Sequence, residues 1–399
     1  MRWTIGIIWL VLHAFPTTVL AKDSEKVVFD FFGDKVELQI GDSFIQPFHE
    51  QPTQESVQHF YNNLNNADYK PLIKQLLAFK QEHQLNDWIF YQLVRKTAQQ
   101  IAPKADNYYR YTLYKWFLLN KSGYDATLAV SNGQLRFYVQ SDEIIYDIPY
   151  YMNKGKQYVC LNIHDYAGTV YDSETFSRID IAIPEGYKAF SYKVTQLPDF
   201  KPDDYITKDI HFDYGREAYH FKIKLNKEVQ VLFKNYPVVD YASYFNIPLS
   251  RETYGTLIPV LKKNTEGMRQ KNGVDFLMRF TRNAFLYETD SVAYGKEKRL
   301  TPEQTLLNTY SDCDDRAALF FYLVKEIYNL PMIVLLYPTH VTIAVKFDKP
   351  IGNTIEYKGH KYSVCEPTPQ SYDLNIGQLS PDLRKTPYEI AYAYEPGLK

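Results

Sequence analysis

The stretch Ser311-Asp312-Cys313-Asp314-Asp315-Arg316-Ala317-Ala318 decides the fold of the C-terminal part of this chain. It opens a run in which apolar residues recur every three or four positions up to Ile327, and this predicts a helix that begins near Cys313. The backbone N–H groups and the dipole at a helix start favour an anion, and therefore a thiolate. The neighbouring acids raise the pKa of a thiol, but helical geometry is expected to send Asp314 and Asp315 away from residue 313.

Two strand patterns that follow the helix each carry a polar residue at one end. His340 begins a strand pattern that runs from His340 to Phe347, and Glu366 ends one that runs from Lys361 to Glu366. Alternation along the first strand places His340 on a small, semi-polar face that suits a cleft, whereas the opposite face is core. A cysteine at a helix start, then a histidine and a carboxylate on successive strands, is the order that thiol-based acyl transfer requires. Cys313 would attack a carbonyl, His340 would move the proton, and Glu366 would orient the imidazole.

This ordered set resembles the transglutaminase-like superfamily, the papain-like group that includes microbial cysteine proteases and transglutaminases. The resemblance covers residues 274–369, about a quarter of the chain. It implies an α+β core in which a helix packs on an antiparallel sheet, with Cys313, His340 and Glu366 as the catalytic triad and no cofactor. The chain departs from the family pattern in having Ser311 where glycine is frequent, Val341-Thr342 after the histidine, and Glu366 in place of aspartate. The backbone N–H of Cys313 is the natural oxyanion donor.

An earlier part of the chain repeats the same order of elements. A helix pattern from Tyr108 to Asn120 is followed by strand patterns at 126–130, 135–140 and 158–161, and the last of these carries Cys160 as the later one carries Cys365. The period is about 205 residues, which indicates duplicated domains rather than a solenoid. Asn107 would then occupy the nucleophile position, Gln134 or Leu135 the histidine position, and Leu161 the carboxylate position. Chance similarity between tyrosine-rich amphipathic segments is the alternative interpretation.

These patterns predict an α+β protein made of a leader and three folded parts. The leader covers residues 1–21, and an α+β domain that would be a degenerate copy of the core covers 22–162. A β-rich middle module without a clear helix covers 163–250, and the transglutaminase-like catalytic domain covers 251–399. Thr301-Pro302-Glu303-Gln304 also predicts a helix start with a capping box.

Residues 1–21 have the pattern of a secretory leader, in which Arg2 precedes an apolar stretch that is too short to span a membrane. We expect an exported protein, periplasmic or secreted, without stable membrane insertion after the leader is removed; a retained N-terminal anchor is the alternative. The net charge is −2 and the basic residues are dispersed, which argues against nucleic acid as a partner. The expected partner is a peptide or protein substrate, or a cell-wall amide.

The chain has three cysteines, so at least one thiol stays free. Cys160 and Cys365 each lie in an apolar strand and are expected to be small buried residues rather than a disulfide. No His/Cys pair has metal-ligand spacing, and no glycine-rich phosphate loop is present, so we expect no metal and no cofactor. Two functions remain: a cysteine-dependent amide hydrolase or transamidase, and a binding or scaffold protein that kept the fold without the activity.

Overall fold

The computed structural model describes residues 24–166, 175–289, 292 and 298–397. Within these residues the chain forms an α+β protein with two five-stranded sheets, both antiparallel throughout. The leader expected over residues 1–21 lies outside the described residues.

The N-terminal half starts with a hairpin, continues with four helices and ends in a sheet. Its elements are β1 (Ser24–Phe31), β2 (Asp34–Gly41), α1 (Gln54–Asn66), α2 (Lys70–Glu82), α3 (Asp87–Ile101), α4 (Tyr108–Lys121), β3 (Ala126–Ser131), β4 (Gln134–Gln140), β5 (Ile145–Tyr146), β6 (Tyr150–Asn153), β7 (Lys156–Cys160) and β8 (Ser177–Ile179).

The C-terminal half repeats this plan, with additional short elements between the hairpin and the last helix. Its elements are β9 (Tyr205–Tyr214), β10 (Glu217–Asn226), α5 (Glu228–Leu232), β11 (Val238–Val239), α6 (Tyr241–Phe245), α7 (Arg251–Thr265), α8 (Gln270–Asn283), β12 (Leu286–Tyr287), α10 (Pro302–Leu307), β13 (Tyr310–Ser311), α11 (Cys313–Tyr328), β14 (Met332–Tyr337), β15 (His340–Val345), β16 (Thr354–Tyr357), β17 (His360–Cys365) and β18 (Glu389–Tyr394). The capping box expected at Thr301 is present, with the Thr301 side chain accepting from the backbone N–H of Gln304.

The two large sheets have the same topology. The strand order is β6-β7-β4-β3-β8 in the N-terminal half and β16-β17-β15-β14-β18 in the C-terminal half, so each strand has a counterpart at the same place in the sheet. Cys160 and Cys365 occupy matching positions as the last residues of β7 and β17. The sequence repeat is therefore a repeat of structure, which chance similarity of tyrosine-rich segments would not produce.

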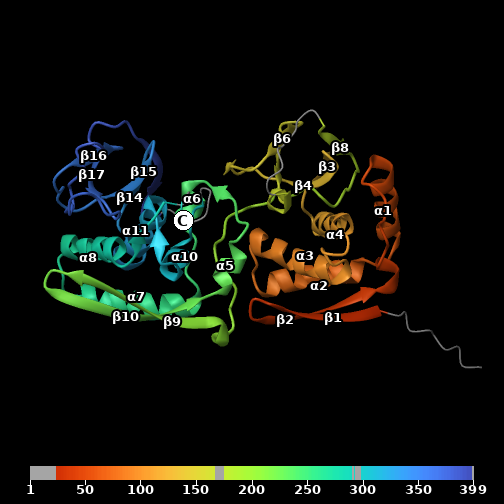
Figure 1. Ribbon diagram of the computed structural model, residues 1–399, viewed down its shortest axis with the longest axis horizontal. Helices are drawn as coiled ribbons and strands as arrows, with labels where there is room; N and C mark the ends of the chain where they lie inside the picture. Colours follow the sequence, from red (N-terminus) through yellow and green to blue (C-terminus); the bar gives the residue numbers. More distant parts are fainter. Residues whose placement is uncertain (1–23, 167–174, 290–291, 293–297, 398–399) are drawn as a thin grey trace, which may run out of the picture.

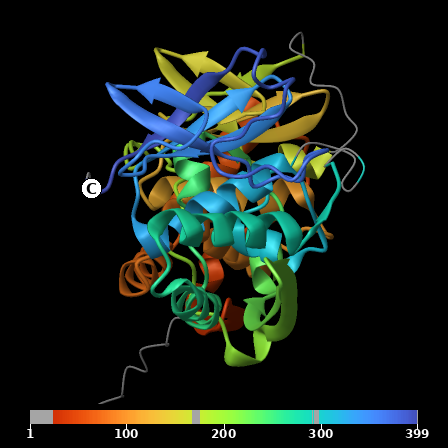
Figure 2. The ribbon, with the colours of Figure 1, turned by 90° about the vertical axis from the view of Figure 1, so that its left-hand side faces the viewer.

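Each half is built in three layers, and the layers run in the same direction (Figure 1). The two-stranded hairpins lie at one side, the helices form the middle layer, and the five-stranded sheets lie at the other side. Figure 2 shows the strands of both sheets, blue and yellow, together at one end of the molecule. Within the C-terminal half, β9 and β10 pack on α8 and α7, while α11 packs on β15.

Helix α11 is the centre of the C-terminal half. It is buried on nearly all sides because α8, α10 and the sheet cover it, and Phe320 and Phe321 are completely buried. A side chain of this size contributes roughly 1.5–3 kcal/mol when it is fully removed from water. The helix ends where Asn329 adopts a left-handed conformation, with φ of 49°.

The strands of the expected middle module do not form one sheet of their own: β9 and β10 form a separate two-stranded sheet, whereas β8 pairs with β3. The described part of residues 163–250 is divided between the halves: β8 completes the N-terminal sheet, whereas β9 and β10 pack on helices of the C-terminal half. The segment also contains two short helices that strand-like patterning had hidden, α5 and α6. Helix α6 starts at the Asp240 cap, whose side chain accepts from the backbone N–H of Ser243. The helix has only five residues, which is too short for apolar periodicity to indicate it from the sequence.

Candidate active site

Asp312 determines where α11 begins. Its carboxylate accepts from the backbone N–H groups of Asp314 and Asp315 at 3.1 and 3.3 Å, and the Asp315 side chain in turn accepts from the N–H of Asp312 at 3.4 Å. This reciprocal capping places Cys313 at the first helical position, where its own N–H has no partner within the helix. Cys313 remains partly exposed, whereas Asp312 and Asp315 are buried.

The two acids after the cysteine differ in orientation. Asp315 points away from the thiol as expected, and accepts from the backbone N–H of Leu300 at 2.8 Å. The expectation for Asp314 was wrong, because its Oδ1 lies 3.5 Å from the Cys313 sulfur. Its Oδ2 lies 3.3 Å from Nε of Arg299 and 3.5 Å from the Tyr241 hydroxyl, and these contacts turn the carboxylate toward residue 313.

The surroundings of Cys313 favour the protonated thiol. Burial raises its pKa well above the ordinary value, and the negative charges of Asp314 and Asp312 raise it further. The backbone of Val341, the residue after the histidine, is close enough to the sulfur to lower the pKa in part. The helix start therefore does not by itself produce the thiolate that the sequence pattern favoured.

His340 and Glu366 form the hydrogen bond expected of an orienting pair. His340 Nε2 lies 2.8 Å from Glu366 Oε2, and Glu366 is only 1% exposed. Because Nε2 is occupied by the carboxylate, Nδ1 is the ring nitrogen left to act on a thiol. Burial lowers the pKa of His340, but the hydrogen bond and charge of Glu366, together with Asp314 and Asp312, raise it above its ordinary value.

The sheet face that carries His340 is more enclosed than expected. Thr342 and Ala344 on the same face are completely buried, because Tyr337, Tyr362 and Leu379 form a second hydrophobic cluster there. His340 itself stays partly exposed because it is the first residue of β15, at the end of the sheet. The negative charges of Asp314 and Asp312, at the start of α11, contribute to its raised pKa.

Two buried arginines that sequence reasoning missed hold these segments together. Arg316 donates to the carbonyl oxygens of Arg282 and Phe285 at 2.7 and 2.9 Å, and so ties α11 to the end of α8. Arg282 donates to the carbonyl oxygen of Glu366 and pairs with Asp373 at 2.8 Å. The signal available in the sequence was an arginine inside each apolar helix pattern, since a buried guanidinium must find several acceptors.

The other two cysteines are not nucleophile candidates. Cys160 and Cys365 are free thiols, and both are completely buried. Burial raises the pKa of Cys160 to about 11 and raises that of Cys365 as well. This agrees with the expectation that each is a small apolar residue of its strand.

The N-terminal half holds a different set of groups at the matching place. Asn107 is the N-cap of α4, so it matches Asp312, and Tyr108 rather than Asn107 matches Cys313. Gln134 begins β4 as His340 begins β15, and Leu161 follows β7 as Glu366 follows β17. The Tyr108 hydroxyl donates to Asp165 at 2.9 Å and accepts from the Asn162 side chain at 2.7 Å. No group at the three matching positions can act as a thiolate, a proton shuttle or a charged orienter.

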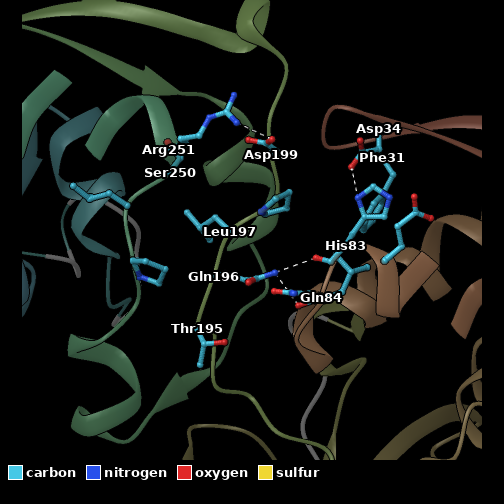
Figure 3. Close-up of a pocket in the computed structure, with 15 residues that line it drawn as sticks. Phe31, Asp34, His83, Gln84, Thr195, Gln196, Leu197, Asp199, Ser250 and Arg251 are labelled. Carbon is cyan, nitrogen blue, oxygen red and sulfur yellow. Dashed lines mark hydrogen bonds and ion pairs between the residues drawn. The ribbon is translucent and has the colours of Figure 1, made fainter. Parts of the chain in front are cut away.

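A cavity of about 530 Å³ lies between the halves, away from Cys313 and His340 (Figure 3). Across it, Gln196 donates to the carbonyl oxygens of His83 and Gln84 at 3.0 and 2.8 Å, and Arg251 pairs with Asp199 at 3.0 Å. These contacts fasten the connecting segment to both halves, so we interpret the cavity as part of the junction rather than as the active site.

Comparison with protein-family models finds no match to this chain, and comparison with curated proteins finds no similar sequence. None of the helices in the described residues combines the length and apolar character needed to cross a bilayer.

Proposed function

We propose that the protein is a cysteine-dependent acyl-transfer enzyme of the transglutaminase-like kind, which hydrolyses or exchanges an amide bond in a peptide, protein or cell-wall substrate. The observation that carries the proposal is the 2.8 Å contact between His340 and a buried Glu366, at the end of the strand that lies beside Cys313. We further propose that the N-terminal half is a degenerate copy of this core, and that the protein acts outside the cytoplasm.

The chemistry follows from the protonation states. Because the thiol pKa is raised, we expect the neutral form of His340 to take the proton in step with attack, rather than a preformed thiolate–imidazolium pair. His340 Nδ1 would take the proton from sulfur as sulfur bonds to the carbonyl carbon, and Glu366 would stabilise the imidazolium that forms. The imidazolium would then protonate the leaving amine, leaving a thioester that water or an amine cleaves to restore the thiol.

The oxyanion of the tetrahedral intermediate needs donors that are already in place. The backbone N–H of Cys313 qualifies, because it lies in the first turn of α11 and is not used by the helix. The partial positive charge at the helix start supports the same anion.

A binding or scaffold function is the second candidate, and one observation favours it. The carboxylate of Asp314 lies 3.5 Å from the sulfur, and with burial and Asp312 it raises the pKa of the thiol. A protein that retained the fold but lost the activity would tolerate such a neighbour.

Thiol alkylation separates the two candidates. Iodoacetamide labelling followed by intact mass should modify Cys313 first, because Cys160 and Cys365 are completely buried. An enzyme should show a Cys313 rate that falls at least about tenfold in His340→Ala, since the imidazole assists removal of the proton. A slow rate that is unchanged in His340→Ala would support the scaffold. A fluorogenic peptide library, with Cys313→Ala as the blank, would then define the substrate.

A further inference from the structure

A second cavity, of about 400 Å³, lies between the two halves near the proposed active site. One wall comes from the N-terminal half, including Trp88 of α3 and Tyr192. The other wall comes from the C-terminal half, where residues 233–238 lead into α6 and where Arg299 precedes α10. A ligand in this cavity would contact both halves at once.

The aromatic side chains in this cavity are held in fixed orientations. Trp88 donates from its indole N–H to the carbonyl oxygen of Leu232 at 3.1 Å and packs edge-on against Tyr236 at 5.2 Å. The Tyr236 hydroxyl donates to the carbonyl oxygen of Tyr192 at 2.5 Å. Rings that are already positioned lose little freedom when a ligand binds, so the cavity is prepared for an apolar or aromatic group.

Two buried polar atoms on the N-terminal wall have no hydrogen-bond partner. The Tyr192 hydroxyl is one, in a side chain that is 1% exposed. His164 Nε2 is the other; it lies 3.3 Å from Asp165 Oδ1 without forming a hydrogen bond. Both atoms line the cavity, so a ligand with hydrogen-bonding groups would satisfy them.

Three cationic side chains line the cavity. Its lining contains the cations Lys234, Lys298 and Arg299 and one carboxylate, Asp147. Arg299 is already neutralised by Asp314 at 3.3 Å, and Lys234 lies exposed on the rim. A ligand that carries a carboxylate complements this surface.

The cavity and the thiol share one residue. Asp314 contacts Arg299 of the cavity wall with Oδ2 and the Cys313 sulfur with Oδ1. The Arg299 guanidinium also lies 4.1 Å above the Tyr241 ring, in the helix that follows the cavity-lining segment. Asp314 therefore links the cavity wall to the thiol.

We propose that this cavity is the substrate subsite for an acidic peptide segment that carries an aromatic side chain. The inference rests on the proposed function, because it assigns the cavity to the substrate of Cys313. The ring would pack against Trp88 and Tyr236, a peptide carbonyl would accept from Tyr192, and the acidic side chain would pair with Lys234. The degenerate half would thus supply one wall of the substrate site.

Binding to the full-length Cys313→Ala variant tests the subsite without any chemistry. Two probes are titrated, N-acetyl-Gly-Glu-Phe-Glu-Gly-amide and its counterpart with lysine in place of glutamate, while tryptophan emission is recorded. The full chain has four tryptophans: Trp88 lines the cavity, Trp116 is buried elsewhere, and Trp3 and Trp9 belong to residues 1–21. Trp88→Phe therefore shows whether the emission change comes from the cavity. We expect the acidic probe to bind at least about tenfold more tightly than the basic one.

Three variants sharpen the result. Lys234→Glu should remove the preference for the acidic probe, whereas Lys222→Glu, an exposed charge reversal on β10, should keep it. Tyr192→Phe should weaken the binding of the acidic probe by about three- to tenfold. Equal affinity for both probes, an equal loss in Lys222→Glu, or no binding at about 1 mM would overturn the subsite.

The subsite and the proposed function fail in different ways. If Cys313 reacts with His340-dependent kinetics but neither probe binds, the enzyme stands and the subsite is wrong. If the acidic probe binds while the thiol is inert, the cavity is a ligand site of a scaffold, and the assignment to a substrate is wrong.

Discussion

Helix α11 begins with the thiol of Cys313 and helix α4 begins with the phenol of Tyr108, although each helix is followed by a sheet of the same strand order. In the C-terminal half, two strand ends carry His340, which is partly exposed, and Glu366, which is buried, and the two side chains are hydrogen-bonded to each other. In the N-terminal half, the Tyr108 hydroxyl fills the corresponding place and is satisfied by Asn162 and Asp165. The same fold thus supports a candidate reactive site in one half and a closed polar network in the other.

The buried side chains of the two helices also differ in polarity. Lys115 of α4 stands where α11 has Phe320, and both are completely or almost completely buried. The Lys115 ammonium lies 4.4 Å from the centre of the Tyr111 ring, and burial together with the charge of Arg95 lowers its pKa to about 7. The N-terminal helix therefore carries a buried amine at the position where the C-terminal helix carries an apolar ring.

The largest expected effect separates the two helix starts. Cys313→Ala should lower turnover of any substrate by about a thousandfold or more, because nothing else in the site can form the thioester. Tyr108→Phe, the matched change in the N-terminal half, should leave turnover within about twofold once its folded fraction is measured. The comparison breaks if Cys313→Ala keeps its activity in a steady-state assay.

The second effect concerns the closed network. Asn162 is completely buried, accepts from the N–H of Phe137 at 2.8 Å, and donates to the carbonyl oxygen of Leu135 at 2.9 Å. Asn162→Leu removes the partner of the Phe137 N–H, whereas the Leu135 carbonyl still accepts from Tyr166 and Tyr108 still donates to Asp165, so it should lower the free energy of unfolding by roughly 2 kcal/mol in urea titration. Iodoacetamide labelling of Cys313 in the folded variant should be unchanged; a changed rate would mean that the halves are coupled.

The third effect is the pH dependence of the His340–Glu366 pair. The folded-state pKa of His340 is raised above 6.5, so Glu366 stabilises the folded protein fully below that pH, and this contribution is lost as the pH rises through the folded-state pKa. Glu366→Gln should therefore cost roughly 2 kcal/mol near pH 6 and clearly less near pH 9. Urea unfolding at both values checks the sign, and a cost that grows with pH would contradict it.

The smallest effect concerns the acid beside the thiol. Asp314→Asn removes the charge 3.5 Å from the Cys313 sulfur and should lower the pKa of the thiol. Alkylation of Cys313 near pH 7.5 should become about five- to tenfold faster. Asp348→Asn, an exposed carboxylate of the same half, serves as the control and should change nothing. A slower reaction in Asp314→Asn would show that this carboxylate assists the thiol.

The sequence determined the local elements and their order. The helix start at Cys313, the capping box at Thr301, the strands that begin at His340 and end at Cys365, and the repeated order in the N-terminal half could all be predicted. Each depends on residues a few positions apart, where periodicity and capping act directly. The short helices α5 and α6 were not predicted from the sequence, because an element of five residues has too little periodicity to be distinguished from a turn.

Only the tertiary structure decided how these elements meet. The division of the middle segment between two halves depends on strand pairing over long distances, which local patterns do not encode. The orientation of Asp314 toward the thiol depends on Arg299 and Tyr241, and the anchoring of Glu366 depends on Arg282. Charges act through space, so the pKa of Cys313 is set by groups that the sequence keeps apart and the fold brings together.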